Sequence, residues 1–381
     1  MTQQHTSARI QDHFHHLTDP RTRKVTYPLI NVVTIALCAV LCGADDFVAI
    51  AEFGEQRRDW LGKFLDLSAG IPSHDRFNAI LGALKPAEFE QCLLSWITAL
   101  HQISGGQIVA IDGKTLRRSF DAASSKSAIH MVSAWATANC ISLGQVVVDD
   151  KSNEITAIPK LLEMLEICGC LVTIDAMGCQ TAIAQAIVDR RADYVLAVKG
   201  NQRKLFRAIQ DYFIDHLEDG YARIKARQHR SSERGHGRDE VREYVVCAVP
   251  ADLPGRERWP QLKAIGMAIT YVTRQGKETS EVRYYILSRL LPVKQFAEAV
   301  RGHWSIENRL HWQLDVTFQE DQSRIRMGHA DANFSILRRT ALSLLKNDRT
   351  LKVGVKNKRL AAGWNENYLA QILFGTNVMV Q

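Results

Sequence analysis

The run of short apolar stretches that follows Gly106 is the feature that most limits how this chain can fold. Residues 107–112 (QIVAID) predict a buried strand, and residues 129–138 and 142–148 predict a hairpin that turns at Asn139-Cys140. Helix and strand patterns then alternate, with helices expected at 157–168, 180–191 and 203–216 and strands at 171–175 and 194–198. The order β-β-β-α-β-α-β predicts a mixed α/β fold, with helices on the faces of a hairpin-led sheet.

The first 104 residues have the pattern of a helical N-terminal domain. Pro28 precedes an apolar stretch, residues 29–42, which predicts a buried helix. The segment 71–77 (IPSHDRF) predicts a turn and an N-cap before a helix that Pro86 ends. Two short helices across such a turn fit a helix-turn-helix that recognises DNA ends, and they fit an ordinary helical hairpin equally well.

The pattern of apolar and charged residues changes twice in the second half of the chain. Basic residues crowd positions 223–242, and alternating strand patterns follow, so residues 220–292 predict a β-rich basic insertion. Residues 293–318 then predict one long helix, and residues 332–345 predict a second. We therefore expect a core built from 105–219 and 293–345, interrupted by the insertion and followed by a basic C-terminal tail, residues 346–381.

Composition narrows the class of protein. Hydrophobic residues make up 46% of the chain and charged residues 23%, which is typical of a globular protein and not of a disordered one. The net charge of +7 suits a polyanionic partner. The 8 cysteines include no C-x-x-C pair, so a zinc knuckle is not expected. The N-terminus lacks a signal-peptide pattern, and residues 29–42 are too short to span a membrane, so we expect a cytoplasmic protein.

Acidic residues follow two of the predicted strands. Asp112 is expected to close the strand QIVAID, and Asp175 closes LVTID. The carboxyl ends of sheet strands are where open α/β folds place ligands, although Asp before Gly is also common in turns. A third acid, Glu307, lies on the predicted helix 293–318, between His303 and His311 at i−4 and i+4.

Two kinds of metal site are compatible with these residues. Carboxylates from two strands and a helix can hold two divalent cations that clamp the oxygens of a phosphodiester. The face formed by His303, Glu307 and His311 instead allows a zinc site, although its spacing is not HExxH. Oxygen ligands at Asp112 and Asp175 favour Mg²⁺ or Mn²⁺. The buried side of the same helix is expected to consist of four residues, Trp304, Leu310, Leu314 and Phe318.

Five segments together resemble a known family: AIDGKTLRRSFD, TIDAMGCQ, YVLAVKGNQ, the basic run at 236–242, and RGHWSIENRLHWQLDVTFQED. They are similar to insertion-sequence DDE transposases of the ISAs1 family, also called H-repeat-associated proteins and related to the IS4-type group. The segment IPSHDRFNAIL resembles the N-terminal helical domain of that family, so the resemblance covers essentially the full length.

The resemblance implies an RNase H-like core and a transposase that cleaves and joins DNA strands at element ends. Asp112, Asp175 and Glu307 are then the catalytic and metal-binding triad, with two Mg²⁺ or Mn²⁺ ions. Double-stranded DNA, both element ends and target, is the implied partner, bound by a homodimer or larger assembly. A bacterial cytoplasmic protein that associates with the nucleoid when bound is implied, with no membrane contact.

The resemblance is incomplete around the third acid, where the related group carries a Tyr-Arg-Glu-Lys signature. Val300, His303 and Leu314 stand at the Tyr, Arg and Lys spacings, so other residues must contact phosphate. The candidate DNA-binding residues are Lys114, Lys199, Asn201, Arg238, Arg242, Arg301, His303, Asn308 and His311. Two alternatives remain open: a DNA-binding protein that has lost catalysis, and a structure-specific nuclease on the same fold.

Overall fold

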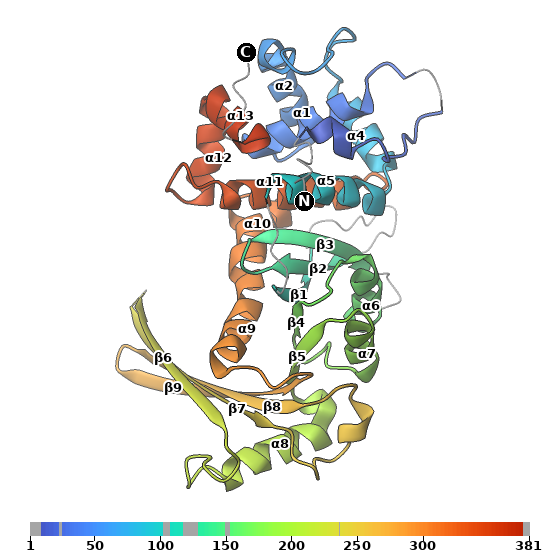
Figure 1. Cartoon of the computed structure of the whole chain (residues 1–381). Helices are drawn as coiled ribbons and strands as arrows, with labels where there is room; N and C mark the ends of the chain where they lie inside the picture. The colour runs from blue at the N-terminus through green and yellow to red at the C-terminus, as the bar shows by residue number, and fades with distance from the viewer. Residues whose placement is uncertain are drawn as a thin grey trace, which may run out of the picture.

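The computed structural model describes residues 9–22, 25–101, 107–116, 129–148, 153–235 and 237–375. A helical layer lies at one end of the molecule and a twisted sheet extends away from it (Figure 1). The helices are α1 (Leu29–Leu41), α2 (Phe47–Gln56), α3 (Arg58–Leu61), α4 (His74–Ala83), α5 (Pro86–Leu100), α6 (Glu154–Met164), α7 (Thr181–Asp189), α8 (Arg203–Asp215), α9 (Val293–Ile306), α10 (Trp312–Val316), α11 (Ala330–Asn347), α12 (Val355–Trp364) and α13 (Glu366–Phe374).

Nine strands form one mixed sheet in the order β3-β2-β1-β4-β5-β9-β8-β7-β6. They are β1 (Ile108–Thr115), β2 (His130–Ala136), β3 (Ile141–Val148), β4 (Leu171–Ile174), β5 (Asp193–Val198), β6 (Arg227–Gly235), β7 (Arg238–Ala248), β8 (Ala264–Arg274) and β9 (Lys277–Leu287). β1, β4 and β5 are parallel to one another, and the remaining neighbours pair antiparallel. The first five strands have the expected RNase H-like order.

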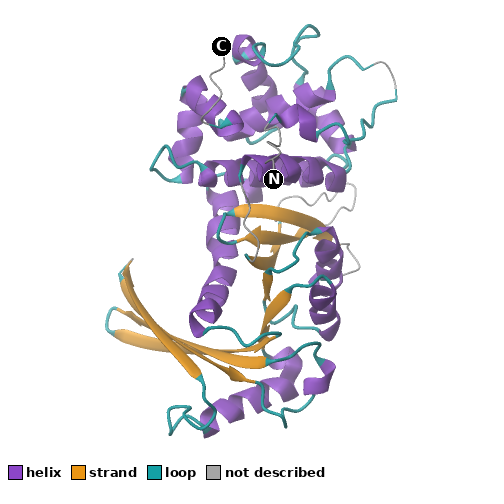
Figure 2. Ribbon diagram, in the orientation of Figure 1, coloured by secondary structure: helices purple, strands orange, loops and turns teal. Residues whose placement is uncertain are grey.

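Helices cover both faces of these first five strands (Figure 2). Val109 and Ile111 of β1 pack in one core with Leu161 of α6 and Ile183 of α7. Ala110, between them, belongs to the other core, which α9, α10 and the helical layer share. Because successive side chains of a strand point to opposite faces, Asp112 and Lys114 face the same side as Ala110, and Gly113 faces α6.

The helical layer combines elements from both ends of the described chain, α1–α5 and α11–α13 (Figure 1). α1 is buried along nearly its whole length, as the uniformly apolar sequence predicts. Ser73 caps α4 by accepting from the Arg76 N–H, and the Asn333 side chain of α11 donates to the carbonyls of Leu81 and Leu84. Segment 71–86 is therefore held in place by a helix from the far end of the chain. No helix among the described residues is long and apolar enough to cross a membrane.

One sequence expectation about the strands was wrong. Asp112 does not end a strand, because β1 continues to Thr115 and pairs Asp112 with Ser133 and Gly113 with Val132 of β2. The basic stretch before residue 236, which the sequence analysis did not divide into strands, forms β6 and pairs along β7. The β-rich stretch also continues the core sheet, since β9 pairs with β5.

The helices differ from expectation in three places. The predicted helix 293–318 is divided by a π-helical turn at Glu307–His311. Trp304, expected on the buried side, is exposed, while Leu310, Leu314 and Phe318 are buried. The basic tail forms α12 and α13, and Lys358 and Arg359 are buried there. Arg359 donates to the carbonyls of Val40, Thr317 and Ala44, so this charge stabilises the helical layer and is not available to DNA.

Candidate active site

The three acids come from three elements that meet at one cleft. Asp112 lies within β1, Asp175 follows the last residue of β4, and Glu307 opens the π-helical turn after α9. β1 and β4 are parallel neighbours, with Ile111 opposite Ile174, so the residues that follow in the two strands lie side by side. All three carboxylates line a cavity of about 100 Å³. The structure therefore brings together residues that are up to 195 positions apart (307 − 112).

Negative charge dominates this cleft. Burial is the main cause that raises the pKa of Asp112 to about 7; the charges of Asp175, Glu307 and Glu154 act in the same direction, and a backbone hydrogen bond from Gly113 acts against them. Burial also raises the pKa of Glu307, in the same direction as the charge of Asp175 and against that of Arg283. The Asp175 side chain accepts from the backbone N–H groups of Met177 and Gly178 at 3.1 and 3.3 Å. The cavity is therefore lined by three carboxylates and by two cationic side chains, Lys199 and Arg283.

The two histidines flank the acids and are uncharged at neutral pH. Burial lowers the pKa of His303 to about 4, and its Nδ1 lies 3.3 Å from Thr173 Oγ1. Burial and the charges of Arg339 and Lys114 lower the pKa of His311 to about 3, and its Nδ1 lies 3.5 Å from Asp112 Oδ2. These contacts differ from those that a zinc site would need. Within the described residues, no group of three His, Cys, Asp or Glu side chains is arranged to hold a metal ion as it stands.

Comparison with known proteins identifies the family. A family model described as "Transposase DDE domain" matches residues 103–344. The chain belongs to the DDE transposase family. A second model, "DDE_Tnp_1-associated", matches residues 11–97 of the helical layer.

Two relatives are similar along nearly the whole transposase chain. "H repeat-associated putative transposase YhhI" of Escherichia coli strain K12 is 40% identical over 381 residues, covering 97% of this chain and 99% of that protein. "Putative transposase YncI" of Escherichia coli O157:H7 is 42% identical over 354 residues, covering 92% and 90%. The H-repeat resemblance inferred from the motifs is confirmed.

Lys114, a candidate for DNA contact in the sequence, is buried and ion-paired in the structure. Its side chain is buried on the same face of β1 as Asp112, and its Nζ donates to Asp315 and, at 2.7 Å, to Glu320. Glu320 is fully buried and also accepts from Ser335 Oγ at 2.7 Å. Burial alone would raise the pKa of Glu320, but the charges of Lys114, Arg339 and Arg338 outweigh burial and hold this pKa at about 2. Lys114 is thus an internal counter-ion of the transposase.

The candidate arginines of the insertion differ in how available they are. Arg242 is 19% exposed and pairs with Glu233 and Glu240. Arg238 is 52% exposed and pairs with Glu240 at 2.6 Å. Arg301 of α9 pairs with Glu233. Glu233 and Glu240 therefore neutralise much of the positive charge that the sequence predicts to be available for DNA.

The remaining candidates lie near the acids. Lys199, after β5, is exposed and lines the same cavity as the three carboxylates. The Asn201 side chain donates to the Ala176 carbonyl at 2.5 Å, which ties the loop after β5 to the loop that follows Asp175. Asn308 is exposed and donates to the Trp304 carbonyl at 3.3 Å.

Arg283 is the cleft residue that the sequence did not reveal. It lies on β9, lines the cavity of the acids, and places its guanidinium 4.1 Å from the Trp304 ring centre. It also forms two hydrogen bonds with Glu281, at 2.8 and 2.6 Å. Only the pairing of β9 with β5 brings Arg283 to the acids, and the strand pattern of residues 277–287 carries no signal of that pairing.

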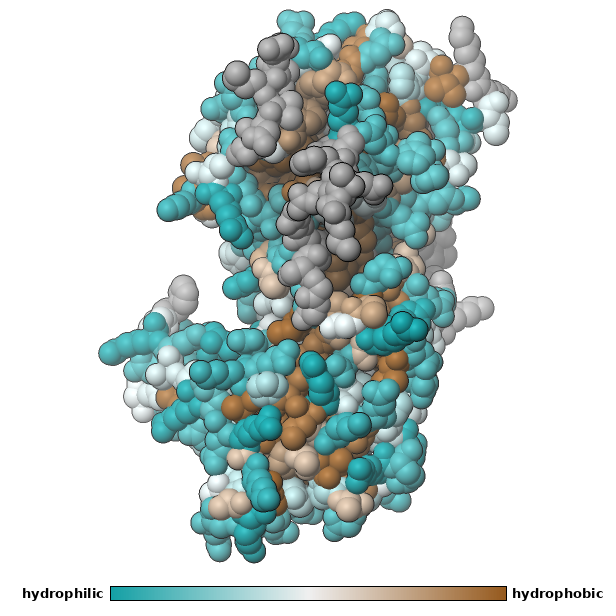
Figure 3. All heavy atoms as spheres, in the orientation of Figure 1, coloured by the Kyte–Doolittle hydropathy of each residue, from teal (hydrophilic) through white to brown (hydrophobic). Residues whose placement is uncertain are grey.

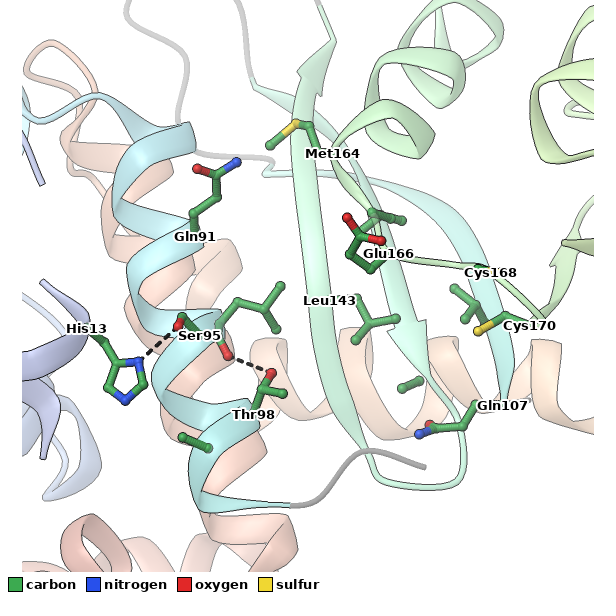
Figure 4. Close-up of a pocket in the computed structure, with 15 residues that line it drawn as sticks. His13, Gln91, Ser95, Thr98, Gln107, Leu143, Met164, Glu166, Cys168 and Cys170 are labelled. Atoms are coloured by element: carbon green, nitrogen blue, oxygen red, sulfur yellow. Dashed lines mark hydrogen bonds between the residues drawn. The ribbon is translucent and has the colours of Figure 1, made fainter. Parts of the chain in front are cut away.

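A larger cavity lies elsewhere, between α5, β3 and the segment 164–170 (Figure 4). It has a volume of about 600 Å³ and a mostly apolar lining that includes Leu143, Met164 and Cys170. His13 and Ser95 are hydrogen-bonded at its edge at 2.9 Å. None of the candidate site residues lines it, so this cavity is not the centre for the chemistry of a transposase.

Proposed function

We propose that this transposase is a metal-dependent DNA strand transferase that cleaves at the ends of an insertion sequence and joins them to a target. The observation that carries the proposal is the single cleft lined by Asp112, Asp175 and Glu307. Burial and the charges of the neighbouring carboxylates raise the pKa of Asp112 to about 7 there, and a divalent cation would offset this negative charge.

The donor set fits a hard divalent cation. Asp112, Asp175 and Glu307 offer only oxygen atoms, which suit Mg²⁺ or Mn²⁺ and do not favour zinc. Two such ions, when bound, activate the attacking oxygen and stabilise charge on the leaving oxygen of a phosphodiester. Neutral His303 and His311 leave the negative charge of the carboxylates undiminished, while Lys199 and Arg283, which line the same cavity, would contact phosphate.

The arm formed by β6–β9 supports a role in holding duplex DNA. It projects from the core beside α9, and its visible surface is mainly hydrophilic (Figure 3). Arg230 and Arg234 are 70% and 90% exposed on β6, each paired with a single carboxylate. Such exposed cations release counter-ions when they bind phosphate. We further propose that the protein acts on double-stranded DNA in the cytoplasm as a homodimer or larger assembly.

Recognition of the element ends is assigned to the helical layer, through the exposed start of α4. His74, Asp75 and Arg76 are exposed there, whereas Phe77 and Leu81 are buried against the rest of the layer. Deletion of residues 70–86 would remove buried core, so substitution of Arg76 is the cleaner test. Arg76→Ala should reduce the preference for terminal over random duplex and leave the folded state intact. An unchanged preference would assign recognition to another surface.

The direct test uses labelled element ends, a supercoiled target and Mg²⁺. Asp112→Asn, Asp175→Asn and Glu307→Gln should each abolish nicking and joining and retain DNA binding, because each removes one carboxylate ligand. Ca²⁺ should support binding without cleavage. Glu163→Gln, an exposed change on α6, is the control and should remain active.

The outcomes separate the alternatives. Nicked DNA without joined product from the wild type would favour a structure-specific nuclease. Binding without any cleavage would favour a DNA-binding protein that has lost catalysis. Retained activity in the Glu307→Gln variant would show that the third acid is assigned to the wrong residue.

A further inference from the structure

We propose that Arg309, Lys346, Arg349 and Lys352 form a surface that binds the DNA backbone beside the scissile phosphate. These four residues are called the four-cation surface below. The inference rests on the proposed function and deepens it, because it names the residues that hold the DNA strand next to the three acids. Two observations carry it: the place where three distant segments meet, and a positive charge that no carboxylate neutralises.

The turn between β2 and β3 joins the active-site helix to the end of α11. Arg309 of the π-helical turn donates through Nη1 to Cys140 Sγ at 3.7 Å. The Asn347 side chain donates to the Asn139 carbonyl of the same β2–β3 turn at 2.8 Å. Lys346 precedes Asn347 in α11, and the loop to α12 follows directly. Cations from the active-site helix and from α11 therefore lie on either side of one turn.

No carboxylate pairs with these four cations among the residues that the structure describes. Three of the four side chains are exposed, and the fourth, Lys346, is half-buried. Asp348 is the nearest acid in the sequence, but it pairs with Lys358 at 3.3 Å and accepts from the Tyr368 hydroxyl at 2.8 Å. The positive charge of the four-cation surface is thus available to an anionic partner.

The environment of Lys346 also favours an anion. Burial lowers the pKa of Lys346; Cys140 acts against this effect, and the charges of Arg309 and Lys358 act with it. A phosphate group bound here would offset the repulsion among these cations. Phosphates of duplex DNA fit this role because their contacts with Lys and Arg also release counter-ions.

The four-cation surface begins at the active site itself. Glu307, Asn308 and Arg309 are consecutive and all exposed, so a strand that crosses this turn meets a carboxylate, an amide and a guanidinium in succession. Successive phosphates of one strand advance by only about 3.4 Å along the duplex axis. The space-filling view shows the outline of the molecule indented between the end of α11 and the arm (Figure 3). On the arm, Glu240 pairs with both Arg238 and Arg242, which lowers the net charge offered there.

The first test measures how DNA binding depends on salt, in EDTA so that no cleavage occurs. The probe is a fluorescein-labelled duplex with the element end and its flanking DNA, and affinity is read by fluorescence anisotropy. The double variant Arg349→Gln/Lys352→Gln should reduce the slope of log affinity against log salt concentration by about two, because each phosphate contact contributes about 0.9. Lys160→Gln removes an exposed cation of α6, on the other face of the sheet, and should leave the slope unchanged.

The second test locates the contact on the DNA. Methylphosphonates at the phosphates that flank the scissile one remove negative charge from the DNA alone. They should reduce the slope of the wild type by more than the slope of Arg309→Gln, because the variant has already lost one of the same contacts. Lys160→Gln should respond to the methylphosphonates as the wild type does.

The outcomes separate this inference from the proposed function. Equal slopes for the wild type and the double variant, with equal unfolding midpoints, would overturn the inference. Equal losses from the methylphosphonates in the wild type and Arg309→Gln would overturn it too. Neither result affects the proposed function if the wild type nicks and joins DNA with Mg²⁺. A wild type that shows the expected slopes but never cleaves overturns the proposed function and supports the phosphate-binding surface.

Discussion

Glu320→Gln tests whether the buried charges below the active site stabilise the fold. The side chain of Glu320 is fully buried, accepts from Lys114 Nζ at 2.7 Å and from Ser335 Oγ at 2.7 Å, and lies near Arg338 and Arg339. Glutamine keeps the length of the side chain and an acceptor oxygen but removes the negative charge. Three buried cations then lose their nearest common counter-ion, and we expect the folded state to be strongly destabilised.

Two arguments give the same magnitude. The folded state lowers the pKa of Glu320 from 4.5 to about 2, a difference of about 2.5 pK units, or about 3–4 kcal/mol at 1.4 kcal/mol per unit. Removal of one partner from a buried ion pair costs about 3–5 kcal/mol in other proteins. Because the folded-state pKa lies below the unfolded-state value, this stabilisation is complete above about pH 4.5 and is lost as the pH falls towards 2.

Denaturant unfolding followed by tryptophan fluorescence measures the effect. At pH 7 the free energy of unfolding of Glu320→Gln should be about 3 kcal/mol below that of the wild type, and at pH 3 the difference should be less than half as large. Glu163→Gln is the matched surface control and should change little. A difference under about 1 kcal/mol at pH 7, or one that does not vary with pH, would refute the argument that the buried charge carries the stability.

Two further changes are predicted from the same charges. In metal-free protein the pKa of Asp112 rises from 3.8 to about 7 on folding, so the free energy of unfolding of the wild type should fall as the pH rises from about 4 to 7. Asp112→Asn should remove that fall and be more stable than the wild type by up to about 4 kcal/mol at pH 8. Denaturant unfolding measures this, and the same pH dependence in wild type and variant would contradict it. Arg234 is exposed and Arg242 is largely buried, so their substitutions should have different effects. Arg234→Ala should reduce the slope of log DNA affinity against log salt concentration by about one, whereas Arg242→Ala should lower the unfolding midpoint. Equal effects of the two variants on the slope would show that burial does not separate their roles.

The core topology and the three acids could be predicted because their signals are local. Each of the first five strands is a short apolar run with a turn beside it, and each helix between them has its own apolar period. Asp175 follows such a run directly, and Glu307 stands out because His303 and His311 share its helix face. Family resemblance then linked the three acids, and the structure brings them to one cleft.

The errors concern residues whose environment is set by distant segments. Lys114 was a candidate for DNA contact in the segment that resembles the family, but its partners in the structure, Asp315 and Glu320, lie more than 200 positions away in the sequence. Arg359 seemed to belong to a basic tail, but its partners are backbone carbonyls of α1, the loop after α1 and the residue after α10. Arg283 reaches the cleft only through the pairing of β9 with β5. Charge counts cannot distinguish a buried counter-ion from a DNA contact.

Three consecutive residues of β1 show how one strand joins stability to chemistry. Asp112 and Lys114 point to the side of α9 and α10, and Gly113 points to α6. Lys114 is fixed by carboxylates of the segment after the π-helical turn, so it ties β1 to the chain that carries Glu307. Gly113 leaves room for Glu154 on the opposite face. The motif Asp-Gly-Lys resembles a simple turn in the sequence. In the structure Asp112 is followed by Gly113, which contacts Glu154 on one face of the sheet, and by Lys114, which pairs with Asp315 and Glu320 on the other. A shift of β1 by one residue would exchange the faces of all three and separate Asp112 from both Glu307 and His311.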